Sequence, residues 1–329
     1  MRRWGAPMAA LLIARLVSGV AATWVGLDPF RAETWIRFDS NLYLEISRKG
    51  YTLFPCPAES GYTPSQWCGN AGWFPLYAWL GPGALLSLAF EAAFLVLLWR
   101  LLLFERSFGA LALAALFPGS IYQQAVFPVP LLLVCVVCFL AALETRREGP
   151  AALAGALGAM SYPTGVLLAP VALFRRAVWP ALAVIAGALV VLAVMRHQTG
   201  RWDAYQLVQS KYAFAFAPLD SLLVRLKPLV NASYRTPATV AAGAQTLLVL
   251  FMLALSVRSW RDRPVLAAYC FLYWAFPLCL GGKLSVHRAE ALLAPVVVLL
   301  PARAAWLLLL AAGPIAFAMD VAFFRGAIT

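Results

Sequence analysis

Residues Trp35 to Tyr51, which read WIRFDSNLYLEISRKGY, form the first long polar stretch of the chain and follow its first apolar run. Leu42 and Ile46 recur at helical spacing after Asp39, so the stretch is predicted to contain a short amphipathic helix. One interpretation of Asp39 is a helix cap that accepts backbone N–H bonds. The other is a catalytic carboxylate at a membrane surface, and the rest of the chain bears on the choice.

The composition of the 329-residue chain is that of a membrane protein. It is 63% hydrophobic and 12% charged, and apolar runs of about 20 residues, each long enough to cross a hydrocarbon core as a helix, recur along it. No long soluble segment separates them, so residues 1–329 are predicted to form one all-α, polytopic membrane domain. The net charge of +12 is attributed to the positive-inside rule and not to nucleic-acid binding.

The order of apolar and basic segments predicts the topology. Arg2 and Arg3 precede an apolar run longer than the core of a usual signal peptide, so the N-terminus is predicted to be cytoplasmic and the run to be an uncleaved signal anchor. This orientation makes residues 28–72 and 197–237 two long extracytoplasmic loops. We expect about ten or eleven transmembrane helices in all.

Some of these expected spans are irregular. Residues 108–127 and 129–143 are predicted to form a hairpin broken at the prolines that follow residue 127, and residues 291–301 a short span. Residues 151–174 have basic segments at both ends, which favours two short helices that meet near residues 161–165 inside the protein.

Six cysteines are present, and four of them lie in apolar runs, where cysteine usually behaves as a small hydrophobic residue. Cys56 and Cys68 instead share the polar loop 28–72. Because the predicted topology exposes this loop to an extracytoplasmic and therefore oxidising compartment, the two are expected to form a disulfide.

Several motifs resemble those of the second mannosyltransferase of GPI-anchor assembly and its bacterial relatives. The most specific motif comprises Phe38-Asp39-Ser40, Tyr43-Leu44, Gly50-Tyr51 and Trp73-Phe74-Pro75-Leu76-Tyr77. Weaker similarity follows at residues 117–120, 163–165 and 286–288. The family belongs to the GT-C superfamily of polytopic glycosyltransferases, which have a catalytic Asp in the first extracytoplasmic loop and use polyprenyl-phosphate sugars.

The resemblance implies a GT-C fold and a multi-pass enzyme of a bacterial plasma membrane. Its expected donor is a polyprenyl-phosphate sugar, with mannose as the sugar, and its expected acceptor is a lipid-linked glycan or another glycosylated molecule. Two positions depart from the family: Tyr162 stands where an Arg precedes Pro-Thr-Gly, and Pro128 and Pro130 occupy a region that often holds Glu. The identity of donor and acceptor therefore rests on the resemblance alone.

An inverting sugar transfer requires a base for the acceptor hydroxyl and cations for the departing phosphate. Asp39, at the position that matches the family's catalytic Asp, is the expected base. The candidate phosphate-binding residues are Arg288, His287, Lys283 and Arg37. The alternatives are contacts to lipid headgroups and, for Arg37, an ion pair that holds Asp39.

Aromatic residues of the motifs are expected to line the substrate pocket, namely Tyr43, Trp73, Phe74 and Tyr162. For Trp73 the alternative is an anchor at the membrane interface. Among other polar residues, Asp203 is a possible partner of Asp39 around a divalent metal, but no cluster of carboxylates supports a metal site and no cofactor is expected.

Arg15 and Glu91 fall near the middle of apolar runs, where a charge needs a partner or a polar cavity. A mutual ion pair is the simplest account, and snorkelling of Arg15 to the interface is the alternative. Two further functions stay open: a transporter or flippase, for which intramembrane charges are typical, and a non-catalytic subunit with the same fold. Asp39→Asn is expected to abolish sugar transfer in an enzyme and to be tolerated in the other two.

Overall fold

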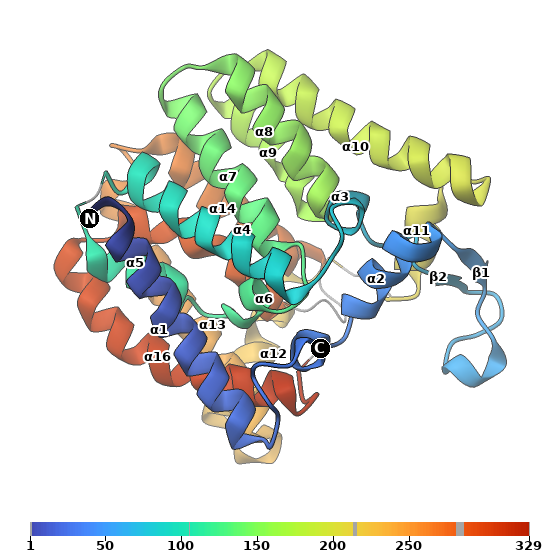
Figure 1. Cartoon of the computed structure of the whole chain (residues 1–329), viewed down its shortest axis with the longest axis horizontal. Coiled ribbons are helices and arrows are strands. Elements are labelled where there is room, and N and C mark those ends of the chain that lie inside the picture. The colour runs from blue at the N-terminus through green and yellow to red at the C-terminus, as the bar shows by residue number, and fades with distance from the viewer. Residues whose placement is uncertain (1, 105, 213–215, 281–285, 329) are drawn as a thin grey trace.

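A computed structural model describes residues 2–104, 106–212, 216–280 and 286–328, and these are mostly helical (Figure 1). The first part of the chain contains α1 (Arg2–Trp24), the 3₁₀ turn η1 (Ala32–Trp35), α2 (Ser40–Lys49), β1 (Leu53–Pro55), η2 (Ala58–Ser60), β2 (Trp67–Gly69) and α3 (Pro75–Trp79). The middle part contains α4 (Ala84–Leu97), the π-helical turn η3 (Leu98–Leu102), α5 (Phe108–Ala115), α6 (Ile121–Gln124), α7 (Val129–Glu144), α8 (Glu148–Ser161), η4 (Pro163–Leu167), α9 (Leu168–Phe174) and α10 (Val178–Thr199). The last part contains α11 (Ala204–Ser210), α12 (Pro218–Val230), η5 (Ala232–Tyr234), α13 (Pro237–Ser256), η6 (Val257–Ser259), α14 (Pro264–Leu280), α15 (Val286–Glu290), η7 (Ala291–Leu299) and α16 (Ala302–Phe324).

Five helices in the described residues are long and apolar enough to cross a membrane. They are Trp4–Trp24, Ala84–Leu102, Val178–Thr199, Pro237–Ser259 and Ala302–Phe324. Three shorter apolar helices accompany them, Val129–Glu144, Pro163–Phe174 and Pro264–Leu280. This architecture agrees with the all-α membrane protein predicted from composition. Of the expected ten or eleven transmembrane helices, five reach spanning length within the described residues, because several apolar runs are broken.

The run 108–127 was expected to be one span, and this prediction is wrong. It is broken after α5, where Pro118 and Gly119 end the helix, and continues as the short helix α6. Gly119 has a positive φ of +81°, and a side-chain Cβ at this position would lie 2.6 Å from the carbonyl oxygen of His287. The break therefore lets the backbone of this segment approach α15 closely.

The run 151–174 forms two short helices, as predicted. α8 ends at Ser161, and the 3₁₀ turn η4 separates it from α9. Gly165 in this turn lies against the backbone of Gly158, where no side chain fits. The expected short span 291–301 is instead the 3₁₀ helix η7, which has Pro295 inside it and is largely buried in the core.

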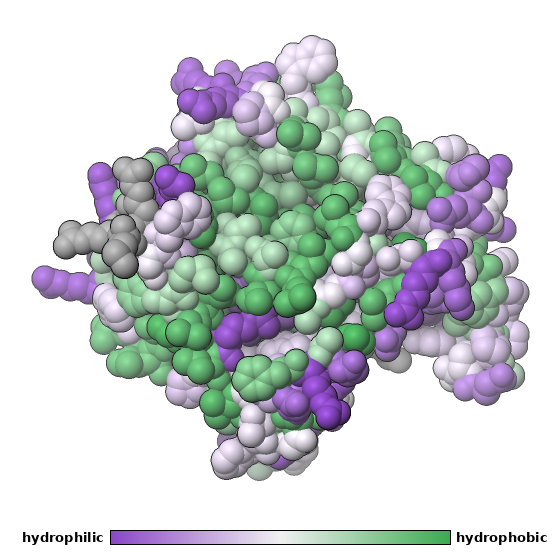
Figure 2. Space-filling model, viewed as in Figure 1, coloured by the Kyte–Doolittle hydropathy of each residue, from purple (hydrophilic) through white to green (hydrophobic). Residues whose placement is uncertain are grey.

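The long helices pack as a layered bundle around one apolar core (Figure 1). α8 lies between α7 and α10, α4 packs on α7, and α1 packs beside α16 and α5. Figure 2 shows a largely hydrophobic face over α1, α4 and α7, with hydrophilic side chains around its rim and in its lower part. An exposed apolar face of this kind is what lipid contact requires.

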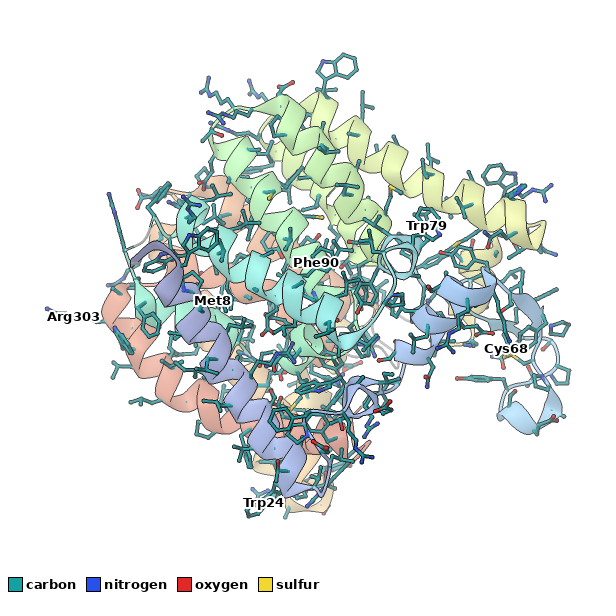
Figure 3. The ribbon with its side chains drawn as sticks, in the orientation of Figure 1. Met8, Trp24, Cys68, Trp79, Phe90 and Arg303 are labelled. Carbon is teal, nitrogen blue, oxygen red and sulfur yellow. A yellow bond between two sulfur atoms is a disulfide. The ribbon has the colours of Figure 1, made fainter. Side chains whose placement is uncertain are left out.

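The loop between α1 and α4 carries the only described strands and projects from the bundle (Figure 1). Strands β1 and β2 pair antiparallel, and the disulfide between Cys56 and Cys68, the pairing predicted from the sequence, joins them. Figure 3 places Cys68 at the edge of the molecule opposite Arg303, which lies at the start of α16. A disulfide across so short a hairpin limits the conformations of the projecting loop.

Candidate active site

Asp39 and Arg288 form an ion pair, with Nη1 of Arg288 donating to Oδ2 of Asp39. The arginine side chain is 11% exposed and the aspartate side chain 25% exposed. The pair is thus partly shielded but reachable from outside the protein. Burial opposes the charge of Arg288, but Asp39, Tyr162 and Tyr122 together outweigh it, and the pKa of Arg288 is raised well above its ordinary value.

The turn before α2 determines where Asp39 lies. Phe38 has a left-handed φ of +52°, which is rare for an aromatic residue. Its ring packs edge-on against Phe323 of α16, with 5.2 Å between ring centroids. The Oγ atom of Ser40 accepts the backbone N–H of Arg37, whereas the Asp39 carboxylate makes no capping hydrogen bond to α2. The helix-cap interpretation of Asp39 is therefore wrong.

Aromatic rings hold Arg288 from the other side. Its guanidinium lies over the rings of Tyr122 and Phe127, at 5.3 and 5.0 Å from their centroids. Both rings belong to the segment that follows the break at Gly119, so the interrupted run builds one wall of the site. Such cation–π contacts favour a cation and fix the plane of the guanidinium.

His287 is the neighbour of Arg288 in α15, but it is packed inside the protein. Its side chain is 5% exposed and stacks on Tyr122, with 5.7 Å between ring centroids. Nδ1 of His287 lies 3.0 Å from Nη1 of Arg225, which comes from α12 in the second long loop. The spacing of the sequence gives no sign of this contact, since Arg225 lies 62 positions earlier.

A second carboxylate, Glu290, lies one turn further along this segment and is buried. It accepts hydrogen bonds from Nε2 of Gln245 at 2.7 Å and from Oγ1 of Thr246 at 2.7 Å. The same Gln245 nitrogen also donates to the carbonyl oxygen of His287 at 3.0 Å. Helix α13 thereby holds α15 in place, which positions Arg288.

Two of the expected pocket residues adjoin the ion pair. Burial raises the pKa of the Tyr162 hydroxyl, and Arg288 acts in the opposite direction through its charge and a hydrogen bond. The side chain of Tyr43 is fully buried, and its ring meets that of Tyr77 edge-on at 5.7 Å. Burial raises the pKa of Tyr43, with Tyr162 and Asp39 among the neighbouring groups that contribute. Tyr162 therefore lies next to Arg288.

The other two expected pocket residues belong to the supporting wall. The side chain of Trp73 is buried, and its carbonyl oxygen accepts the hydroxyl of Tyr51 at 2.8 Å. The ring of Phe74 meets that of Tyr205 from α11 edge-on at 5.6 Å. Because Trp73 is only 8% exposed, its role as an exposed interface anchor is not supported.

The second long loop contributes residues that sequence reasoning missed. Nζ of Lys211 lies 5.2 Å from the ring centroids of both Tyr62 and Tyr212. Burial lowers the pKa of the Lys211 ammonium, and the charge of Asp39 opposes this shift, which places Lys211 within electrostatic range of Asp39. The one feature of the sequence that indicates this segment is a basic residue, Lys211, among the tyrosines of residues 205–212.

The two long loops are fastened to each other. Oε1 of Gln198 accepts the backbone N–H of Tyr51 at 2.6 Å, and Nε2 of Gln209 donates to the carbonyl oxygen of Gly72 at 2.9 Å. Each of these hydrogen bonds joins two residues that are more than 130 positions apart in the sequence. They explain why residues from both loops reach one site.

Two other predicted participants are not brought into the site. Arg37 donates to the carbonyl oxygens of Glu33 and Ile36, so it does not hold Asp39 as an ion-pair partner. Asp203 pairs with Arg201 on the exposed surface at 2.8 Å. Lys283 lies outside the described residues. In the part of the chain that the structure describes, no group of three or more His, Cys, Asp or Glu residues could hold a metal ion.

Arg15 and Glu91 form the ion pair predicted between them, at 3.2 Å. The Glu91 side chain is fully buried, and the Arg15 guanidinium also lies over the ring of Trp35 at 4.9 Å. This contact links α1 and α4 to η1, the turn that precedes Phe38. The ion pair therefore stabilises the segment that precedes Asp39, without touching Asp39 itself.

No model of a known protein family matches the chain, and no curated protein matches it either. The motifs quoted above and the geometry of the site are therefore what bear on its function.

Proposed function

We propose that this chain is a membrane glycosyltransferase of the GT-C type, which transfers a sugar from a polyprenyl-phosphate donor to an acceptor hydroxyl on the extracytoplasmic face. Mannose and a glycan acceptor are proposed from the motif resemblance. The observation that carries the proposal is the contact between the Asp39 carboxylate and the Arg288 guanidinium. It joins the residue of the most specific motif to a basic residue from the far end of the chain.

The reaction that this pair supports is an inverting displacement. The acceptor oxygen forms a bond to the anomeric carbon while the bond from that carbon to the phosphate oxygen breaks. The acceptor proton passes to the Asp39 carboxylate, and the polyprenyl phosphate leaves with the bonding electron pair. Arg288 and Lys211 stabilise the negative charge of the leaving phosphate.

In this reaction Arg288 exchanges its partner Asp39 for the phosphate of the donor. In the free protein Arg288 neutralises Asp39, and both are partly shielded from water. A donor phosphate that binds Arg288 competes for the guanidinium and frees a carboxylate oxygen for the acceptor hydroxyl. Binding of the donor then precedes activation of the acceptor, which limits wasteful hydrolysis.

The exposed apolar surface supports a lipid-linked donor. The site lies next to helices long and apolar enough to cross a membrane, so the polyprenyl tail can remain among lipids while the phosphate reaches Arg288. The arginine-rich short loops and the Cys56–Cys68 disulfide support an active site on the extracytoplasmic side. A bacterial plasma membrane is proposed from the motif resemblance.

One observation favours transport as a second candidate. Oγ of Ser18 donates to the buried carboxylate of Asp320 at 2.5 Å, and both residues lie on spanning helices close to the Arg15–Glu91 pair. Buried polar groups of this kind also occur along substrate paths. A transporter, however, needs no carboxylate base at Asp39, so one variant separates the two functions.

The test is turnover of a panel of polyprenyl-phosphate sugars by the purified chain in lipid nanodiscs. We expect one member to release polyprenyl phosphate, and Asp39→Asn to lower that rate at least about 10²-fold, the lower range for loss of a general base. Asp203→Asn is the matched control, because it removes a carboxylate from an exposed outer-loop ion pair. Near wild-type turnover by Asp39→Asn, with the donor still bound, would show that Asp39 is not the base.

A further inference from the structure

The contact between Arg225 and His287 determines the protonation of a buried imidazole. Nη1 of Arg225 lies 3.0 Å from Nδ1 of His287. A guanidinium has only N–H donors and stays charged at all accessible pH values, so it cannot accept a hydrogen bond. Nδ1 must therefore be the acceptor, and the proton of the neutral ring must be on Nε2.

The surroundings of His287 bear on the same point. Arg288 is adjacent to it in α15 and pairs with Asp39, and the Tyr122 ring of α6 stacks on the imidazole. Burial lowers the pKa of the Arg225 guanidinium, and the buried carboxylate of Glu290 opposes this shift. The guanidinium stays a cation because its ordinary pKa is so high. An imidazolium would place its Nδ1–H against the N–H group of Arg225, with two positive charges in contact.

We infer that Arg225 is a positioning residue that holds His287 as a neutral imidazole with its proton on Nε2. His287 then acts as a neutral hydrogen-bond donor and not as a third phosphate-binding cation. That it donates to a phosphate oxygen rests on the proposed function, whereas the tautomer does not. Because Arg225 belongs to α12, the second long loop sets the state of a residue next to Arg288.

The chain has two histidines, His197 and His287, which makes a direct test simple. His197→Gln leaves a single imidazole, and ¹⁵N-histidine labelling of this full-length protein in nanodiscs reports both ring nitrogens. We expect the shifts of a neutral Nε2–H ring even at about pH 5.5, where an ordinary histidine with a pKa of about 6.5 is mostly protonated. A ring that is protonated at this pH, or that carries its proton on Nδ1, would overturn the inference.

Variants at Arg225 test the cause. Arg225→Met removes the donor and should let the ring take up a proton at a higher pH than it does beside Arg225, whereas Arg225→Lys retains a charged donor and should restore part of the effect. Arg235→Met is the control, because Arg235 donates to the carbonyl oxygens of Pro228 and Leu229 at the end of the same helix. An unchanged spectrum in Arg225→Met would refute the role of Arg225, and failure of that variant to fold leaves the single-histidine spectrum as the deciding result.

The spectrum needs no substrate, so it separates this inference from the proposed function. If sugar transfer is found, Arg225→Met should also move the acid limb of its pH profile to higher pH, as the imidazole becomes protonated more readily. If no transfer is found but the Nε2–H ring is, the tautomer stands and only its role toward a phosphate is lost. A pH profile of Arg225→Met identical to that of the active wild type would contradict that role.

Discussion

Asp39 and Arg288 are 249 positions apart in the sequence and form an ion pair in the folded chain. Asp39 comes from the turn before α2, in the first long loop. Arg288 comes from the short helix α15, which follows α14. The first is positioned by the Phe38–Phe323 contact and the second by Tyr122 and Phe127. The two long loops and the C-terminal helices thus meet at one pair of charges.

Replacement of Arg288 should affect donor binding more than folding. Arg288→Met removes a hydrogen bond to a charged group, and such bonds contribute about 1.5–3 kcal/mol, so donor affinity should fall by about tenfold to a hundredfold. Arg288→Lys keeps the charge but loses the planar contact with the aromatic rings, and should be intermediate. Binding of a fluorescent polyprenyl phosphate measures this. Arg37→Met, which removes bonds to backbone carbonyls only, should bind normally, and equal losses in both variants would argue against a specific role of Arg288.

Donor binding should weaken at alkaline pH because Lys211 loses its positive charge there. Burial lowers the pKa of its ammonium, so the positive charge is lost as the pH rises through a value below that of an exposed lysine. Donor binding should weaken there, and Lys211→Arg should extend it to higher pH because arginine stays charged. Lys227→Arg, at an exposed lysine beside Tyr234, should leave the pH dependence of donor binding unchanged.

Folding stability should change with the opposite sign over the same pH range. Between the lowered pKa of Lys211 and the ordinary value of about 10.4, the unfolded chain binds more protons than the folded one, so this group makes stability rise with pH. Donor binding that falls while thermal stability is maintained would therefore identify loss of the Lys211 charge. A parallel fall of both would indicate general unfolding instead.

The buried pair of Arg15 and Glu91 should matter for stability and not for chemistry. Arg15→Met leaves the Glu91 carboxylate without a cation in an apolar interior, and breaking a buried pair in this way typically costs about 3–5 kcal/mol. The double variant Arg15→Met/Glu91→Leu removes both charges and should recover most of the loss. Unfolding in nanodiscs measures both. A double variant no more stable than Arg15→Met would contradict this account.

The turn between α8 and α9 should tolerate no side chain at Gly165. A Cβ there would overlap the backbone of Gly158, so Gly165→Ala should destabilise the fold by about 1–3 kcal/mol, the usual range for overpacking. Gly149 at the start of α8 has open space around it, and Gly149→Ala should be neutral or stabilising by up to about 1 kcal/mol. Thermal unfolding compares the two. Equal melting temperatures for both variants would show that the turn can open.

Much of the architecture is predictable from the sequence because hydropathy is a local property. Apolar runs of spanning length identify the five long helices, and the basic residues at both ends of the run 151–174 identify its division into two. The pairing of Cys56 with Cys68 follows from their shared loop. The run 108–127 has the length and hydropathy of a span, but Pro118 and Gly119 interrupt it, because these residues stop a helix whatever its apolar content.

Local sequence patterns are enough to predict the membrane class, the helical character and Asp39 as a candidate residue. Which cation meets Asp39 depends on how the helices pack. Arg37, Lys283, His287 and Arg288 are all candidates in the sequence, and within the described residues the packing of α15 against Tyr122 and α13 brings Arg288 to Asp39. Contacts between residues hundreds of positions apart leave no local pattern, because they depend on how the helices pack and not on the neighbours of either residue.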